Sequence, residues 1–297
     1  MSLSFYREAD EFLGDKHTRY FGSGYINSSH EIFNLKIESD NIDNFKVFCL
    51  GRVTLPTMWS IKGESNQKPH LSTIDIIELS ILTFNKFISE MCNKNICGKK
   101  LIHKIDITAG KVPIESDFDK IEIRGVLKRF NLDLNILSLN ISNMTIQIYY
   151  HTDISVIKFN HYGDYLKSPL EINDVMINID EMKATALVNN KRILKEHIEP
   201  WSTSCLFAVG LQLGQILLYQ LDLITRENSN TLWMKKTEIY FLSDTPNIDV
   251  SHPIFTRLEN VKRYTKPDGD WRRADICSYI GNTKIICSVT HKLPLSA

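Results

Sequence analysis

The chain has 297 residues, of which 43% are hydrophobic and 10% aromatic, so it can bury one or two cores and does not have the composition of a disordered protein. Thirty-five Lys and Arg residues are balanced by 35 Asp and Glu residues, which leaves none of the basic excess typical of nucleic-acid-binding proteins. Residues 1–15 carry five charged side chains where a signal peptide has an apolar segment. We therefore expect a cytoplasmic protein whose six cysteines are free thiols.

The first half of the chain has strand patterns on either side of one long apolar stretch. Residues 25–53 alternate apolar and polar side chains as strands do, and residues 72–91 are predicted to form a helix. Three further segments rich in Ile and Val, residues 101–112, 119–130 and 144–159, are predicted to be strands. The order is therefore strands, a long helix, and strands again.

The second half repeats this order. Residues 170–193 are predicted to be strands with a break at Asn189 and Asn190, and residues 203–225 are predicted to form a second long helix. This helix is long enough to span a membrane, but its glutamines favour a buried core helix, so we expect no membrane span. Strands are then expected at 232–242, 256–264, 271–279 and 284–292, with turns at Asp268-Gly269 and Gly281-Asn282.

The repeated order predicts two units, residues 1–163 and 164–297, joined within residues 161–169. A sheet that curls around one long apolar helix is the hot-dog fold. Gly210 and Gly214, one helical turn apart, would let a strand approach the second helix closely. We therefore predict an α+β tandem double hot-dog, in which two antiparallel sheets each wrap a long buried helix. The alternative is an unrelated α+β fold in which both helices lie on a sheet.

The segment that leads into the first helix, Pro69-His70-Leu71-Ser72-Thr73-Ile74-Asp75, is the main candidate site. A helix start presents free N–H groups and the positive end of the helix dipole, which suit an acyl carbonyl or a developing oxyanion. We predict that His70 is the catalytic base or acid there, and that Asp75 orients its imidazole. Ser72 and Thr73 would shape the pocket. Ser72 and Asp75 also match the S-x-x-D capping box, which needs no further function.

The second helix begins in a similar way, with Pro200-Trp201-Ser202-Thr203-Ser204-Cys205. When the prolines of the two segments are aligned, Trp201 takes the place of His70. This difference favours one dominant active site, or one site shared between the halves.

Polar side chains on the two helices extend the predicted site. Glu78 lies on the same side of the first helix as Asp75, and Gln212 and Gln215 share a face of the second helix. Such groups in an apolar helix must bond to the sheet backbone or bind a substrate. We include Glu78, Gln212 and Gln215 among the predicted substrate-binding residues.

Only one of Arg272 and Arg273 can face the interior, because successive strand residues point to opposite faces of a sheet. A solvated arginine is the simpler interpretation, and an anion clamp for a phosphate, a carboxylate or a pantetheine-bearing partner is the functional one. Arg273 completes the predicted substrate-binding set. The Walker, nucleophile-elbow, dinucleotide and zinc-protease motifs do not occur, so the sequence predicts no metal site and no cofactor.

Three motifs give the chain a family resemblance: Tyr6-Arg7-x-Ala9-Asp10-x-x-Leu13-Gly14, Arg19-Tyr20-Phe21-Gly22-x-Gly24-Tyr25, and the segment from Pro69 to Asp75. Through them the chain resembles the AvrD (avirulence D) family of bacterial proteins. The resemblance implies a role in making syringolides, secreted acyl-sugar lactone signals recognised by plants, by joining a β-ketoacyl group from a thioester to a pentulose. The similar γ-butyrolactone synthases of the A-factor type, also double hot-dogs, imply acyl transfer followed by cyclisation.

Together, the residues and the resemblance predict a biosynthetic enzyme, an acyltransferase or condensing enzyme of hot-dog type. Its partners would be an acyl thioester, carried by CoA or by acyl carrier protein, and a sugar-like acceptor. One alternative is a dehydratase or thioesterase that uses His70 and a carboxylate, and a second is a non-catalytic acyl-binding module. The sequence leaves open the acyl chain length, the acceptor, the carrier, and whether the chain forms a homodimer.

Overall fold

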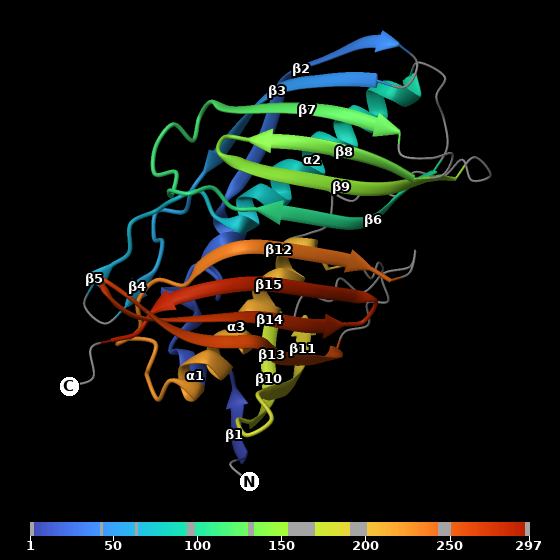
Figure 1. Cartoon of the computed structure of the whole chain (residues 1–297). Coiled ribbons are helices and arrows are strands. Elements are labelled where there is room, and N and C mark those ends of the chain that lie inside the picture. The colour runs from blue at the N-terminus through green and yellow to red at the C-terminus, as the bar shows by residue number, and fades with distance from the viewer. Residues whose placement is uncertain are drawn as a thin grey trace.

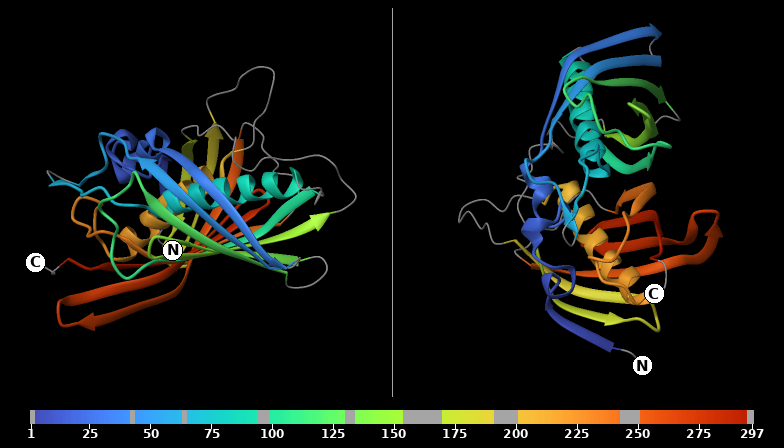
Figure 2. Two further views of the ribbon diagram at one scale, coloured as in Figure 1. Left: turned by 90° about the horizontal axis from the view of Figure 1, so that it is seen from above. Right: turned by 90° about the vertical axis from the view of Figure 1, so that its left-hand side faces the viewer.

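One antiparallel sheet of 13 strands curves around two long helices, α2 (Thr73–Asn93) and α3 (Thr203–Leu221), as Figure 1 shows. The computed structural model describes residues 3–41, 44–62, 65–93, 99–129, 134–153, 170–190, 201–242 and 251–294. Each helix lies on the concave side of its own part of the sheet (Figure 2). This is the arrangement of two hot-dog units in tandem, and the predicted double hot-dog fold is confirmed.

The strands divide into two groups by the helix that they enclose. The N-terminal group, around α2, contains β2 (Ser29–Asn41), β3 (Asn44–Thr54), β6 (Lys99–Thr108), β7 (Ile121–Arg129), β8 (Leu134–Ile141) and β9 (Met144–Asp153). The C-terminal group, around α3, contains β1 (Leu3–Glu8), β10 (Leu170–Asn178), β11 (Lys183–Asn190), β12 (Trp233–Phe241), β13 (Ser251–Lys266), β14 (Gly269–Ile280) and β15 (Thr283–Lys292). The short elements are α1 (Asp10–Leu13), η1 (Lys16–Thr18), η2 (Gly24–Asn27), β4 (Ile61–Lys62) and β5 (Ser65–Asn66).

The two sheets that the sequence predicts are joined into one. β6 and β12 pair along five residues, with Ile107 opposite Thr237 and Ile105 opposite Ile239. Two separate units would each expose an edge strand with unpaired backbone groups at this place. Pairing the edges satisfies these groups and makes the sheet continuous.

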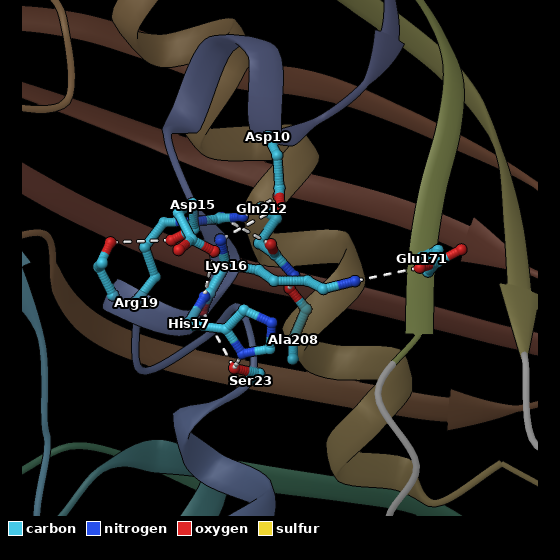
Figure 3. A network of polar contacts seen from close by, with 10 residues as sticks. Asp10, Asp15, Lys16, His17, Arg19, Ser23, Glu171, Ala208 and Gln212 are labelled. Atoms are coloured by element: carbon cyan, nitrogen blue, oxygen red, sulfur yellow. Dashed lines mark hydrogen bonds and ion pairs between the residues drawn. The ribbon is translucent and has the colours of Figure 1, made fainter.

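The N-terminal segment belongs to the C-terminal half of the fold, although residues 1–163 were predicted to be one unit. β1 pairs with β10, and the amide of Ala9 donates to the carbonyl of Ile172 at 2.9 Å. Figure 3 shows Lys16 reaching Glu171 of β10, with 3.1 Å between Nζ and Oε1. The boundary at 163/164 and the join at 161–169 lie outside the described residues.

The strand assignments differ from the prediction in three places, the first of which is β1, which was not predicted. β8 was missed, although its inner side chains alternate with outer ones, because it is separated from β9 only by a tight turn with Ser142 at a φ of 52°. The predicted break at Asn189 and Asn190 falls on the last two residues of β11, and the turn at 179–182 that separates β10 from β11 was not predicted. Asn189 pairs with Ser251 of β13 and Asn190 with Leu170 of β10, and these pairings outweigh the weak strand preference of asparagine.

α3 is buried along nearly all of its length. Among the described helices it is the one long and apolar enough to cross a membrane, and most of that apolar stretch is buried inside the protein. Strand β14 passes close to its glycines: a methyl group on Gly214 would lie 2.4 Å from Cγ2 of Ile276, and one on Gly210 would lie 2.8 Å from Oγ of Ser278. The predicted close approach of a strand to Gly210 and Gly214 is therefore confirmed.

We expect Gly214→Ala to lower the free energy of unfolding by up to about 2 kcal/mol. Overpacking against Ile276 costs about 1–3 kcal/mol, and the better helix propensity of alanine returns about 1 kcal/mol. Urea unfolding followed by circular dichroism measures the change. In an Ile276→Ala background the same substitution should be neutral or stabilising, and an equal loss in both backgrounds would show that the close contact is not the cause.

The C-terminal end of α3 is held by a buried carboxylate. Asp222, the residue after the helix, accepts hydrogen bonds from Nε of Arg272 at 2.9 Å and from Nε2 of His291 at 3.1 Å. Burial acts to raise the pKa of Asp222, but the hydrogen bonds from His291 and Arg272 outweigh it and hold the pKa below the ordinary value of 3.8. Asp222 therefore links the helix end to β14 and β15 as a carboxylate.

We expect Asp222→Asn to lower the free energy of unfolding by up to roughly 3 kcal/mol near neutral pH, because it leaves half-buried Arg272 without its counter-charge. A carboxylate whose folded-state pKa is depressed adds stability that is complete above its unfolded pKa and is lost as the pH falls through the folded pKa. The gap between the wild type and the variant should therefore narrow below about pH 4. Urea titrations between pH 3 and pH 7 test this, and a gap independent of pH would contradict it.

Candidate functional site

The start of α2 is a capping box. Oγ of Ser72 accepts a hydrogen bond from the amide of Asp75 at 3.2 Å, and Oδ2 of Asp75 accepts one from the amide of Ser72 at 2.7 Å. The predicted capping role of both residues is therefore confirmed. The carboxylate of Asp75 is fully buried, so the other groups that contact it must stabilise it in place of water.

A network of three side chains surrounds the carboxylate of Asp75. It accepts hydrogen bonds from Oγ of Ser72 at 2.7 Å and from the hydroxyl of Tyr20 at 3.2 Å, and Nε2 of His30 lies 2.8 Å from Oδ1. Burial and the charge of Asp75 raise the pKa of Tyr20 well above its ordinary value, so Tyr20 remains a neutral donor. Asp75 thus fixes the positions of Ser72 and Tyr20.

The histidine that contacts Asp75 is His30 of β2, and not His70 as the sequence suggests. Asp75 points inward between α2 and the sheet, whereas His70 precedes the helix and lies nearer the surface. His70 donates from Nδ1 to the carbonyl of Lys68 at 3.1 Å, which assigns the proton to Nδ1 and leaves Nε2 as the basic nitrogen. Asp75 therefore does not orient His70 directly.

His70 lies between two tryptophans at the junction of two cavities. Its ring centroid is 5.3 Å from that of Trp59 and 6.3 Å from that of Trp233. The first cavity has a volume of about 260 Å³ and the second about 230 Å³. His70, Ser72 and Trp233 line both, together with the neighbours of Trp233, Leu232 and Met234.

The two cavities differ in character. The first is lined by polar and aromatic side chains: Arg19, Tyr20, Phe21, Trp59, Ser60, Lys62, Gln67, Lys68, Glu115, Gln215, Arg226 and Thr231. The second is lined by small, apolar and basic residues: Leu71, Thr73, Ala109, Gly110, Lys111, Val112, Pro113, Met144, Lys235, Lys266, Trp271 and Thr290. Both halves of the chain contribute to each cavity.

The structure brings together four of the predicted site residues and separates the others. His70 and Ser72 line both cavities, Thr73 lines the second and Gln215 lines the first. The remaining residues lie elsewhere: Asp75 is buried behind Ser72, Glu78 accepts a hydrogen bond from Ser204 of α3, Gln212 accepts one from Arg19 at 2.8 Å, and Arg273 is exposed on β14.

The sequence did not point to the cations of the first cavity. Arg19 and Tyr20 belong to one of the motifs that carry the family resemblance, which is the only signal that marks them. Lys62 and Arg226 lie in short connecting segments that have no spacing pattern, so they come together only through the fold. His30 opens a strand and is likewise unmarked.

The capping serines show how the two helix starts correspond. Oγ of Ser202 accepts from the amide of Cys205 at 3.1 Å, which makes Ser202 the counterpart of Ser72. Trp201 then corresponds to Leu71, not to His70, and Cys205 takes the place of Asp75. The cap sets the helix start, so aligning the prolines misplaced the register by one residue. The second helix start has no carboxylate in this position.

The tandem helices, the continuous sheet and the paired cavities define a double hot-dog protein with one composite candidate site. The chain belongs to the AvrD family, since the family model described as Pseudomonas avirulence D protein matches residues 4–132 and 162–294. No curated protein matches the chain in sequence.

Several solved structures are similar over nearly the whole chain at low identity. A TesB protein of Mycobacterium avium subspecies paratuberculosis is 8% identical, with a TM-score of 0.45, over 88% of this chain and 96% of its own. The dehydratase domain of RzxB from Pseudomonas fluorescens is 10% identical, with a TM-score of 0.44, over 86% and 97%. A conserved protein with a hot dog fold from Alicyclobacillus acidocaldarius is 11% identical, with a TM-score of 0.45, over 88% and 97%.

Proposed function

We propose that the chain is a biosynthetic enzyme that transfers the β-ketoacyl group of a thioester onto a pentulose or a similar sugar, toward a syringolide-like acyl lactone. The observation that carries this proposal is that two cavities meet at His70 and Ser72. A reaction between two substrates needs them held side by side at the reacting atoms. Membership of the AvrD family supports these substrates, which the family implies.

The lining of each cavity supports one assignment of the substrates. The acyl chain would lie in the second cavity, beside Val112, Met144 and Trp271. The sugar would lie in the first, where Gln215 and Ser60 offer hydrogen bonds to its hydroxyl groups. The thioester would be carried by CoA or acyl carrier protein, which are made in the cytoplasm, and this supports a cytoplasmic location. A homodimer is compatible with this scheme, which does not require one.

In this mechanism Nε2 of His70 accepts the proton of a sugar hydroxyl as its oxygen attacks the thioester carbonyl. Backbone N–H groups in the first turn of α2 stabilise the negative charge that develops on the carbonyl oxygen. The carbon–sulfur bond then breaks, the new ester bond is complete, and the proton passes from His70 to the leaving thiolate. Asp75 acts as a positioning residue by holding Ser72 and Tyr20 at the cavity wall.

A dehydratase or thioesterase is the alternative on the same fold. Such an enzyme would pair His70 with a carboxylate, and Asp75 faces His30 instead. Glu115 is the acidic residue among the described residues that line the two cavities, and it forms an ion pair with Lys68. These contacts favour transfer to a sugar over hydrolysis or water loss. A non-catalytic acyl-binding module would need the cavities but not the basic nitrogen at their junction.

Incubation of the purified protein with a β-ketoacyl thioester, with and without xylulose, distinguishes these functions. We expect thiol release that depends on the sugar, because the acceptor cavity adjoins the thioester site. A thiol-reactive dye measures the rate, and mass spectrometry identifies the acyl sugar. Release without sugar, or loss of water from the acyl group, would favour the alternative enzyme. Binding without turnover would indicate the acyl-binding module.

We expect His70→Ala to lower the sugar-dependent rate by about 10²–10⁴-fold, as removal of a general base does. The ring is half-buried and makes one hydrogen bond to the backbone, so the unfolding temperature should stay close to that of the wild type. His103→Ala, on the exposed side of β6, is the matched control and should keep full activity. A fully active and folded His70→Ala protein would remove His70 from the mechanism.

A further inference from the structure

The first cavity contains a cluster of cations that have few counter-charges. Lys62 of β4, Arg226 of the segment after α3, and Arg19 of the segment after η1 all line it. The chain as a whole has no net charge, so this concentration is a local feature of the fold. Glu115 is the acidic residue among the described residues of this cavity wall, and it forms an ion pair with Lys68.

Lys62 and Arg226 are bound by neutral acceptors. Nζ of Lys62 donates to the carbonyl of Asn230 at 2.8 Å, to Oγ of Ser229 at 3.0 Å and to the carbonyl of Ser229 at 3.3 Å. Arg226 donates to the carbonyl of Ile61 at 2.7 Å and to Oγ of Ser60 at 3.0 Å. In the described part of the chain neither cation forms an ion pair with a carboxylate, whereas cations withdrawn from water are normally paired.

The two cations also act on each other. Burial and the charge of Arg226 lower the pKa of Lys62 to about 8. Burial likewise lowers the pKa of Arg226. Backbone and hydroxyl groups thus hold two like charges together in a partly dry site, at a cost to the stability of the free protein. An anion between them would remove that cost.

Arg19 adds a third positive charge to the cavity wall. Its side chain is 4% exposed, and it is bound by Asp10 and by Oε1 of Gln212 at 2.8 Å, as Figure 3 shows. Its Nε atom is buried and has no hydrogen-bond partner. Burial foremost, together with the charge of Arg226, lowers the pKa of Arg19 to about 10 despite the opposing effect of Asp10.

We propose that the first cavity binds the phosphoryl group of a substrate, with Lys62 and Arg226 as its ligands and Arg19 as a supporting charge. This rests on the proposed function, whose acceptor occupies the same cavity. A guanidinium fork and a lysine ammonium are the usual protein partners of a phosphate, and a dianion matches the charge that Lys62 and Arg226 present.

Two substrates of the proposed reaction could supply this group. One is a phosphorylated pentulose, and the other is the thioester, whose CoA or phosphopantetheine carrier bears phosphates. The cations share a cavity of about 260 Å³ with His70, which suits a sugar phosphate whose hydroxyl reaches His70. The same phosphate chemistry serves either source, and the experiment separates them.

Binding is measured by calorimetry without turnover, so that a failure of the anion site and a failure of acyl transfer are seen separately. The first pair of probes is xylulose 5-phosphate and xylulose. The second is a β-ketoacyl-CoA and the same acyl group on pantetheine, which lacks the phosphates. Wild type is compared with Lys62→Gln and Arg226→Gln, and with Lys120→Gln as a control at an exposed lysine.

We expect xylulose 5-phosphate to bind at least tenfold more tightly than xylulose, and each cavity variant to abolish most of that preference while Lys120→Gln retains it. A phosphate preference confined to the CoA pair, and lost in the same variants, would support the site with the thioester as its source. If neither phosphate improves binding, or if the cavity variants bind as the wild type does, the proposal is overturned.

Thermal unfolding gives a readout that a merely structural role would not produce. Because unpaired like charges destabilise the free protein, Lys62→Gln should unfold at the same or a higher temperature than the wild type when no anion is present. The rise in unfolding temperature caused by xylulose 5-phosphate should be smaller in this variant. A Lys62→Gln protein that is less stable without ligand and gains as much from it as the wild type would indicate a structural lysine.

Discussion

A buried carboxylate at the start of α2 is the interaction on which the candidate site depends. Asp75 is fully enclosed, and a charge in that position is tolerated only if donors surround it. The donors come from three places in the chain: Tyr20 after η1, His30 on β2, and Ser72 at the helix cap. One side chain therefore ties the N-terminal segment, the sheet and the helix together at the wall of the cavities.

Asp75 supports the cavity wall without lining either cavity itself. Ser72 and Tyr20 both line the first cavity and both donate to Asp75, and their hydroxyl oxygens lie within hydrogen-bond distance of each other at 3.0 Å. Removing the charge would free these donors and leave His30 buried beside a neutral group. Ser72 and Tyr20 would then no longer be fixed at the wall of the cavity. His70, two residues before the cap, would no longer be held in its position.

The sequence predicts best those features of the fold that depend on residues close together in the chain. Both helices and their caps follow from apolar length and from serines whose side chains bond three residues ahead, so their starts were placed to within one residue. The strand partners were not accessible in this way. β1 could be assigned to the C-terminal half only by its pairing with β10, and Asn189 and Asn190 to β11 only by their pairing with Ser251 of β13 and Leu170 of β10.

The site shows the same division. His70, Ser72 and Thr73 were found because a helix start is a local pattern, and Gln215 because it interrupts an apolar helix. Lys62 and Arg226 are 164 positions apart in the chain, and His30 contacts Asp75 across 45 positions, so only the tertiary fold brings these partners together. Arg273 shows a limit of local patterns. Alternation along β14 correctly predicts that Arg272 and Arg273 point to opposite faces of the sheet, but it does not predict which of the two faces inward.

The charge distribution explains how a chain with no net charge can still select an anionic ligand. Composition averages over the surface, where acidic and basic residues pair with one another in solvent and cancel at a distance. Inside the first cavity, Lys62 and Arg226 are partly withdrawn from bulk water, so their field is screened less. Selectivity for a ligand then depends on a few cations in a low-dielectric wall, and not on the overall balance of charge.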